Sequence, residues 1–333
     1  MTLTTRSIVL AQIPVGHPGP DTWRLETADV PVLGEGEALV RTRYLSLDPA
    51  MRGWINGVDT YVPAVKIGEV MRASGVGEVV ESRSDRYPVG SLVSGLLGWQ
   101  EHAVASATNP MQVLPEGTDP KLAVGVLGVT GLTAYFGLLD LGQPKEGETV
   151  LVSGAAGATG SAAGQIAKIL GCRVVGIAGG PEKCALLTDV LGFDEAIDYK
   201  AGDVRPAIAA SCPGGVDVFF DNVGGDILEA GLTFINLNAR IVLCGGISGY
   251  NEVEPRPGPR NIMNLVLKRA RMEGFIVIDY RKRFPEAVAQ LAQWVAAGQL
   301  RQVDTVVHGL ENAPKAFDML FSGGNTGKLM IEV

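Results

Sequence analysis

Residues 150–171, VLVSGAAGATGSAAGQIAKILG, constrain the fold of this chain more than any other stretch. An apolar run ends at Gly154, the chain passes Gly157 and Gly160, and a helical pattern of small and apolar residues follows. A strand that turns sharply into a helix directs the first helical N–H groups, and the positive end of the helix dipole, toward a bound pyrophosphate. Gly157 would let the backbone approach the phosphates, and Gly160 would let the helix lie close to the strand.

The glycine spacing alone also fits a simple tight turn, so the flanking segments decide its meaning. A second apolar run at 173–178 follows the helix, which gives the order strand, turn, helix and strand of a dinucleotide-binding unit. We therefore predict that the dinucleotide is bound by Gly157, Ala158, Thr159 and Gly160.

The end of this second strand distinguishes NAD from NADP. NAD enzymes usually place Asp or Glu there to bind the ribose 2′-hydroxyl. This chain reads VVGIAGGPEKC, with Gly179 and Gly180 at the corner and Lys183 just beyond. Lysine attracts a 2′-phosphate, whereas an acidic side chain repels it, so the pattern favours NADP(H). The alternative is that Lys183 is a solvated residue of the next helix, beside Glu182.

The pattern of predicted strands and helices along the sequence indicates two kinds of domain. Residues 1–125 contain short β-branched runs cut by glycine and proline, at 38–47, 74–81 and 91–94, which predict a strand-rich, barrel-like domain. Residues 126–300 alternate strands and helices, as in a doubly wound parallel sheet covered by helices on both faces. Residues 301–333 are expected to return to the first domain. The expected strands after residue 125 are 150–153, 173–178, 196–199, 216–221, 240–244, 271–278, 303–307 and 328–333, and the helices are 159–170, 182–191, 227–235, 285–297 and 313–321.

Charge and composition disfavour some classes of binding partner. The 333 residues carry a net charge of −8, which disfavours nucleic acid or an anionic membrane as the main partner. No run reaches the roughly 18 apolar residues that span a bilayer, and the first residues do not resemble a signal peptide, so we expect a cytoplasmic protein. The histidines and cysteines are scattered without ligand spacing, so we expect no bound metal; the cysteines are Cys172, Cys184, Cys212 and Cys244.

Several motifs in one order resemble a known family. They are YLSLDPAMRG at 44–53, GWQEH at 98–102, GLTAYFGLLDLGQPKEGETVLVSGAAGATG at 131–160, FFDNVGG at 219–225, CGGISGYN at 244–251 and GNTGK at 324–328. They are similar to the zinc-free branch of the medium-chain dehydrogenase/reductases, which includes prostaglandin reductases, 2-alkenal double-bond reductases and bacterial curcumin reductase. The resemblance implies an α/β protein with a GroES-like β-rich domain and a Rossmann domain, and a homodimer joined through edge strands of the Rossmann sheets.

The resemblance also implies further cofactor contacts. Lys183 and Tyr199 match positions at the 2′-phosphate. Positions toward the nicotinamide are matched by Asn222, Cys244, Gly245, Gly246, Ile247, Ser248, Gly249, Tyr250, Phe275, Ile276, Val277 and Asn325. For Asn222 and Asn325 the alternative is a turn role beside glycine, and for Cys244 it is a small buried residue at the end of a strand.

Zinc-dependent relatives carry an early catalytic cysteine and a four-cysteine cluster, whereas this chain has SLDPAMRG and no such cluster. Without a Lewis acid, alcohol oxidation has no obvious means of stabilising an alkoxide. Reduction of an activated C=C bond needs less help: hydride goes to the β-carbon and charge collects on the carbonyl oxygen as an enolate. We therefore predict an NADPH-dependent reductase of enones and enals in which Tyr250 donates to the enolate. The alternative is that Tyr250 only packs against substrate.

Two departures from the family leave the substrate open. Relatives often have tyrosine at the position of Ala50, and read MPGLTAY where this chain has Val129, Thr130 and Gly131. The physiological substrate and the stereochemistry are not specified by the sequence. Competing interpretations are a zinc-free NADPH quinone reductase and an NADPH-binding protein without turnover.

Overall fold

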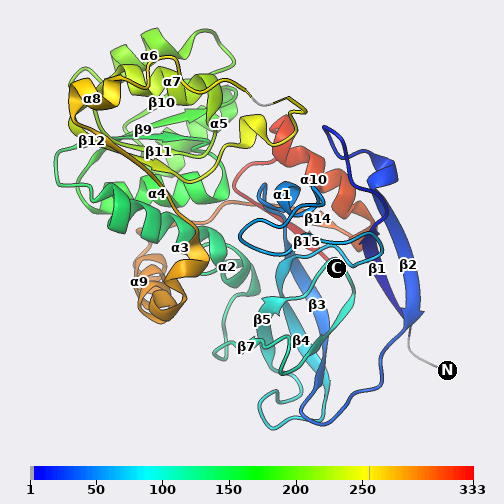
Figure 1. The fold of residues 1–333 in the computed structure, drawn as a ribbon. Helices are drawn as coiled ribbons and strands as arrows, with labels where there is room; N and C mark the ends of the chain where they lie inside the picture. Colours follow the sequence, from blue (N-terminus) through cyan, green and yellow to red (C-terminus); the bar gives the residue numbers. More distant parts are fainter. Residues whose placement is uncertain (1–3, 255) are drawn as a thin grey trace. The chain divides into compact units, whose positions relative to one another are not determined.

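The chain forms two compact units in a computed structural model that describes residues 4–254 and 256–333 (Figure 1). Unit 1 contains the described residues up to Gly125 together with Asp304–Val333, and unit 2 is Val126–Val303. Among the residues described, no helix is both long and apolar enough to cross a membrane.

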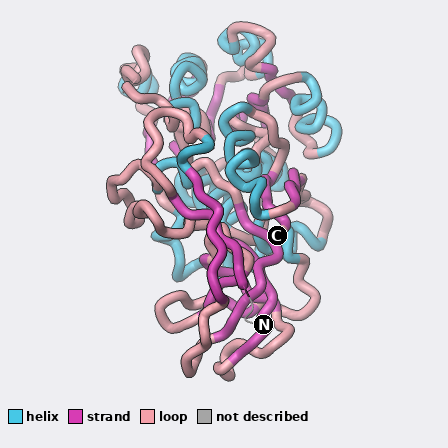
Figure 2. Tube along the Cα trace, turned by 90° about the vertical axis from the view of Figure 1, so that its right-hand side faces the viewer, coloured by secondary structure: helices cyan, strands magenta, loops and turns pink. Residues whose placement is uncertain are grey.

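Unit 1 is built mainly from strands, shown in magenta in Figure 2. A seven-stranded sheet has the order β14-β15-β3-β4-β5-β7 with β6 paired to β3, and β1 and β2 form a separate antiparallel pair. The C-terminal strand β15 lies parallel to β14 and antiparallel to β3, which joins the last residues of the chain to the N-terminal segment. The elements are β1 (Thr4–Leu10), β2 (Trp23–Asp29), β3 (Ala38–Ser46), α1 (Met51–Trp54), β4 (Ser74–Ser82), β5 (Leu92–Leu96), β6 (His102–Ala105), β7 (Gln112–Val113), α2 (Pro120–Val124), β14 (Asp304–His308), α10 (Ala313–Ser322) and β15 (Lys328–Glu332).

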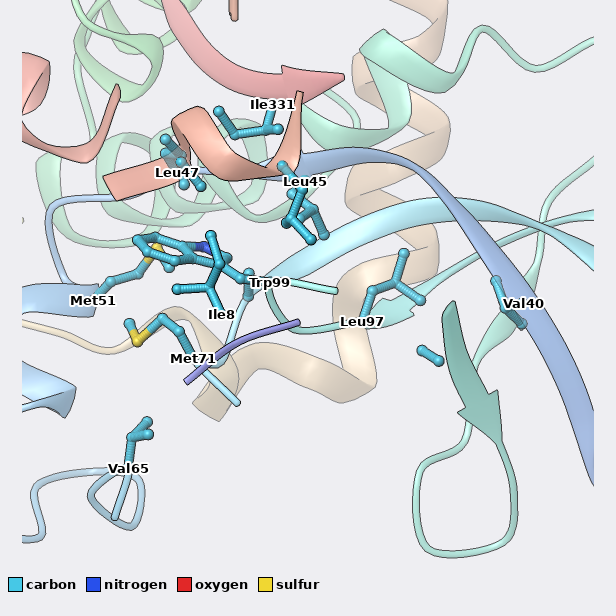
Figure 3. Packing of buried hydrophobic residues seen from close by; sticks show 14 of the residues in the cluster. Ile8, Val40, Leu45, Leu47, Met51, Val65, Met71, Leu97, Trp99 and Ile331 are labelled. Carbon is cyan, nitrogen blue, oxygen red and sulfur yellow. The ribbon is translucent and has the colours of Figure 1, made fainter. Parts of the chain in front are cut away.

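The core of unit 1 gathers around Trp99, which is fully buried among Ile8, Met51 and Met71 (Figure 3). The Trp99 ring lies 5.9 Å from that of Phe317 on α10, edge to face. Buried aromatic rings contribute large apolar areas, so this contact fixes the C-terminal helix to the N-terminal strands.

Unit 2 contains a six-stranded parallel sheet of order β10-β9-β8-β11-β12-β13. From β8 the chain adds β9 and β10 toward one edge of the sheet, and from β11 it adds β12 and β13 toward the other edge. This reversal of direction defines a doubly wound sheet. Figure 1 shows α3 and α4 on one face of the sheet and α6 and α7 on the other. The predicted α/β architecture is thereby confirmed. The elements are α3 (Val129–Phe136), β8 (Thr149–Ser153), α4 (Ala158–Ile169), β9 (Arg173–Ala178), α5 (Pro181–Ala185), β10 (Glu195–Asp198), α6 (Val204–Ser211), β11 (Val216–Asp221), α7 (Gly225–Thr233), β12 (Ile235–Leu243), α8 (Asn264–Lys268), β13 (Arg271–Gly274) and α9 (Phe284–Ala296).

Helix α4 is held close to its surroundings by small residues. A Cβ placed on Gly164 would lie 2.0 Å from a ring atom of Phe193, so a larger residue fits there only if the ring or the helix moves. Strand β8 is buried along its whole length, as expected for the centre of a sheet covered on both faces. Packing thus holds α4 close to the segment that precedes β10, and β8 lies at the centre of the sheet.

Several elements differ from the sequence prediction: β12 begins at Ile235 rather than at 240, and α3, α6 and α8 were not among the expected helices. The strand expected at 271–278 ends at Gly274, and residues Val277–Arg283 form a 3₁₀ helix. Gly274 pairs with Leu243, the last residue of β12, so the neighbouring strand ends at that point. Beyond it Phe275 packs over Gly137, where a Cβ would lie 2.5 Å from its ring. The β-branched residues that follow favour a strand by propensity, but the end of the partner strand and this packing prevail.

Candidate functional site

The carboxyl ends of the parallel strands in unit 2 bring most of the predicted site residues to one edge of the sheet. Because the strands run in the same direction, the turns that follow them lie at the same edge. These turns are 154–157 after β8, 179–180 after β9, 222–224 after β11, 244–249 after β12 and 275–277 after β13. Asn325 belongs to unit 1, where its Nδ2 donates to the Gly327 carbonyl at 3.2 Å in the turn before β15.

The glycine turn after β8 forms a cradle of backbone atoms. Gly154 has a φ of +58°, a conformation that favours glycine, and Gly157 is the N-cap of α4. A Cβ on Gly160 would lie 2.4 Å from the Gly154 carbonyl oxygen and 2.9 Å from the Ala155 Cα. Helix α4 therefore starts against the turn, and a glycine N-cap gives its first N–H groups no side-chain acceptor. This arrangement fits a pyrophosphate.

The corner after β9 carries the features of a 2′-phosphate site. A Cβ on Gly179 would lie 2.8 to 2.9 Å from the Tyr199 ring and hydroxyl, so the ring occupies the space of a side chain at this corner. Lys183 is half-buried, and its pKa is lowered by burial and then by the charge of Lys200. Two neighbouring ammonium groups, one partly desolvated, favour a bound anion between or beside them. The charge of Lys200 thus acts on Lys183, and Lys200 was not among the residues predicted from the sequence.

An acidic residue is present at this corner, but it comes from the next strand. Asp198, the last residue of β10, accepts hydrogen bonds from the Gly180 N–H at 2.7 Å and the Lys200 N–H at 2.9 Å. These two bonds lower the pKa of its carboxyl. Asp198 therefore holds the backbone of the corner. The sequence prediction missed it because it considered only the end of β9.

The ends of β8, β11 and β12 are joined by Asp221, whose side chain is fully buried. The Ser153 hydroxyl donates to its Oδ1 at 2.5 Å, and the N–H groups of Val223 and Gly224 donate to the carboxyl at 3.2 and 2.9 Å. Burial raises the pKa of this carboxyl, against the opposing effect of these three bonds. From the sequence, Asp221 is only one residue of the motif FFDNVGG, with no predicted role of its own. A serine and an aspartate at the ends of adjacent parallel strands were the available signal.

Asn222 is held by the same serine. Its N–H donates to the Ser153 Oγ at 2.9 Å and its Nδ2 donates to the Ser153 carbonyl at 2.7 Å. The carbonyl of Asn222 in turn accepts the Ile247 N–H at 3.3 Å. Asn222 therefore has the turn role that was one of its two interpretations, and it also supports the loop after β12.

Tyr250 lies just after the short 3₁₀ helix Ile247–Gly249. Its hydroxyl oxygen accepts a hydrogen bond from the Gly246 N–H at 3.1 Å. A Cβ on Gly245 would lie 3.1 Å from this hydroxyl, so glycine leaves room for it. This bond to the hydroxyl oxygen orients the phenol within the loop.

The two remaining segments are less polar. Cys244 begins the loop after β12, and burial, followed by the charge of Asp221, raises the pKa of its thiol to about 12. The thiol is therefore neutral at physiological pH, and by exposed area Cys244 is half-buried. Residues 275–277 are half-buried at the end of β13. Within residues 4–254 and 256–333, no three His, Cys, Asp or Glu side chains come together in a way that could hold a metal ion.

Known proteins resemble this chain along nearly its whole length. Residues 6–113 match the family described as the N-terminal domain of oxidoreductase, and residues 158–293 match the zinc-binding dehydrogenase family. The NADPH-dependent curcumin reductase of Escherichia coli (strain K12) is 46% identical over 98% of this chain and 96% of its own. The NADP⁺-dependent 2-alkenal reductase of Nicotiana tabacum is 38% identical, over 99% of this chain and 98% of its own. The crystal structure of CurA from Vibrio vulnificus in complex with NADPH superposes with a TM-score of 0.94 at 44% identity, covering 98% of this chain and 99% of that one.

The two-unit fold and the edge of the parallel sheet define a Rossmann-type oxidoreductase of the medium-chain dehydrogenase/reductase class. Within that class, the chain belongs to the zinc-free family of the curcumin, 2-alkenal and prostaglandin reductases. The family resemblance noted in the sequence is thereby confirmed.

Proposed function

We propose that this protein uses NADPH to reduce the C=C bond of α,β-unsaturated ketones and aldehydes. The cofactor is NADP(H): two similar proteins are named for NADP(H) dependence, and a third was crystallised with NADPH. The glycine cradle and the Lys183 corner provide groups of the right kind to hold its pyrophosphate and its 2′-phosphate. The observation that carries the proposed reaction is the Tyr250 hydroxyl, fixed at the edge of the sheet by the Gly246 N–H.

The binding residues would act at three points along the cofactor, which supplies a hydride when bound. The backbone of residues 157–160 would hold the pyrophosphate. Lys183 and Tyr199 would hold the 2′-phosphate, with Lys200 as a second cation. The nicotinamide end would be oriented by Asn222, Cys244, Gly245, Gly246, Ile247, Ser248, Gly249, Phe275, Ile276 and Val277. The predicted contact of Asn325 with the cofactor stays a prediction.

Tyr250 would stabilise the charge that develops on substrate. Hydride addition to the β-carbon moves the π electrons toward the carbonyl oxygen, and the phenol donates a hydrogen bond to this enolate. The α-carbon then takes a proton, by way of the same hydroxyl or from water, to give the saturated ketone or aldehyde.

The sequence departs from that of many relatives at Ala50 and Thr130, and we propose that these positions alter substrate choice. Tyr61 offers aromatic surface in unit 1, with 43% of the residue exposed. Its hydroxyl accepts the Trp54 Nε1–H at 3.0 Å, which holds the two rings together. Conjugated aromatic enones are accordingly included among the substrates to be tested.

Tyr250→Phe tests the assignment of the donor. The variant keeps the ring but removes the hydroxyl, and loss of one such donor typically lowers turnover by about 10² to 10³. We expect the lower end of that range, because the nicotinamide ribose hydroxyl remains as a second donor. NADPH affinity should change little. A near-normal kcat with a saturating enone would reduce Tyr250 to a packing residue, and a loss confined to NADPH affinity would make it a cofactor contact.

Two other functions are distinguished by one substrate panel. Enones, enals and quinones are each incubated with enzyme and NADPH, and both NADPH consumption and product mass are measured. Faster turnover of quinones than of every enone would favour a quinone reductase. NADPH binding without turnover of any compound would favour a non-catalytic protein.

We also propose a homodimer formed through the edge of the parallel sheet in unit 2. Strand β13 is an edge strand with β12 as its neighbour, and it exposes three of its four residues. Beside it in the sequence, α8 and the preceding residue expose Met263, Val266 and Leu267 at 61%, 64% and 70%. An exposed edge with adjacent apolar side chains is suited to pairing with a second copy. Sedimentation equilibrium should give twice the chain mass, and Val266→Glu should shift the protein toward monomer. Residence in the cytoplasm stays a prediction.

A further inference from the structure

The carboxyl of Asp221 is the most deeply buried acid of unit 2 that the proposed reaction leaves without a role, with 0% of the residue exposed. Burying a carboxyl is costly unless hydrogen bonds satisfy it, and here a hydroxyl and two backbone N–H groups point at its oxygens. All three donors come from Ser153, at the end of β8, and from the turn after β11. The carboxyl therefore holds that turn against the neighbouring strand.

Hydrogen bonds lead from this turn to Tyr250. The Asp221 carbonyl accepts the N–H groups of Cys244 and Gly245 at 2.8 and 3.2 Å. The Val223 carbonyl accepts both the N–H and the hydroxyl of Ser248, at 3.1 and 2.7 Å. With the bond between Asn222 and Ile247, these contacts fix the loop that carries the Gly246 N–H, which in turn holds the Tyr250 hydroxyl.

We propose that Asp221 is a positioning residue that sets the turn at 222–224 and, through it, the loop at 244–250 that presents Tyr250. The inference rests on the proposed role of Tyr250 for its effect on turnover. Its structural part, the ordering of the loop, does not depend on that role.

Asp221→Asn is the most informative change because the side chain keeps its size. In one orientation its amide nitrogen faces the Gly224 N–H, and in the other it faces the Val223 N–H. A donor therefore meets a backbone donor in either case, which loosens the turn.

Asp217→Asn is the matched control. Asp217 lies on the same strand, and its carboxyl also accepts a backbone N–H from β8, that of Thr149, at 2.9 Å, as well as the Asn236 amide at 2.8 Å. It lies at the amino end of β11, away from the turn. A general loss of strand stability would affect both variants, whereas the proposed positioning affects only Asp221→Asn.

The test is hydrogen exchange measured by mass spectrometry on peptides that cover 244–251, together with the kcat for a saturating enone. In Asp221→Asn we expect exchange of the 244–251 amides to be about tenfold faster, the lower part of the range for one lost buried acceptor. Peptides that cover β9 should be unchanged. We expect kcat to fall about tenfold in the same variant, with neither change in Asp217→Asn.

Unchanged exchange at 244–251, or equal effects in the Asp217→Asn control, would overturn the proposal. Faster exchange with normal kcat would uphold the positioning of the loop and instead contradict the role of Tyr250. When Asp221→Asn is added to Tyr250→Phe, no further loss of kcat is expected, and a full additional tenfold loss would show that Asp221 does not act through the hydroxyl.

If Asp221→Asn fails to fold, Ser153→Ala provides the same test. It removes the hydroxyl that donates to Asp221 and accepts from Asn222, and leaves the carboxyl in place. Faster exchange at 244–251 is again expected, and normal exchange would refute the proposal.

Discussion

Replacing Lys183 with alanine tests the choice of cofactor. The ammonium is half-buried, and burial, followed by the charge of Lys200, lowers its pKa. A phosphate bound there would neutralise two repelling charges and would be attracted more strongly than on an open surface. Loss of one charged contact is worth about 1.5 to 3 kcal/mol, or roughly ten- to a hundredfold in affinity. Because Lys200 remains, we expect the lower end of that range for NADPH.

The assay is fluorescence titration of both reduced cofactors into the wild type, Lys183→Ala and a control. NADH lacks the 2′-phosphate, so its dissociation constant should hardly change. The matched control is Lys168→Ala, because Lys168 forms an ion pair with Asp194 at 2.8 Å near the other end of α4. Equal loss of affinity for NADH and NADPH in Lys183→Ala would refute the assignment of the 2′-phosphate corner.

Two further predictions concern the framework of unit 2. Gly160→Ala should weaken NADPH binding and lower the free energy of unfolding by about 1 to 3 kcal/mol, because the added Cβ would overlap the turn. Gly214→Ala is the control, since no atom lies within 4 Å of its Cβ. Cofactor titration and urea unfolding should show no change in NADPH affinity or in stability for Gly214→Ala. Burial acts to raise the pKa of Glu148, but the hydrogen bonds from Arg240 and the Lys145 N–H outweigh burial and hold that pKa below its ordinary value. The ionised Glu148 carboxylate therefore adds to the free energy of unfolding above about pH 4.3, and this contribution is lost as pH falls through the folded pKa. Arg240→Met should therefore reduce the loss of stability between pH 6 and pH 3, and an unchanged acid dependence would contradict this assignment.

The doubly wound sheet was predictable because local and global signals agree in unit 2. Strand β8 is a continuous run of β-branched and apolar residues, and the glycines after it mark the place where strand and helix touch. The shortening of the strand at 271–278 was not predictable, because it depends on where β12 ends and on packing between Phe275 and Gly137. Propensity describes a residue alone, whereas the length of a strand depends on its partner.

The site was predictable in part for a related reason. Lys183 could be inferred from the missing acidic residue at the end of β9, and Tyr250 was supplied by the family resemblance. The hydrogen bonds of Asp198 and Asp221 join neighbouring strands across 18 and 68 residues of sequence, and the effect of Lys200 on Lys183 likewise depends on how the strands lie side by side. Such cross-strand contacts require the register of the sheet, which the sequence pattern did not specify.

The central claim, hydride transfer to the β-carbon of an enone, is tested most directly by isotope labelling. NADPH carrying deuterium at the transferred position of C4 is incubated with the enzyme and an enone, and the product is analysed by mass spectrometry and NMR. The account predicts a saturated ketone with one deuterium at the β-carbon, while the hydrogen added at the α-carbon comes from water. Deuterium at the carbonyl carbon of an allylic alcohol, with the C=C bond intact, would contradict it.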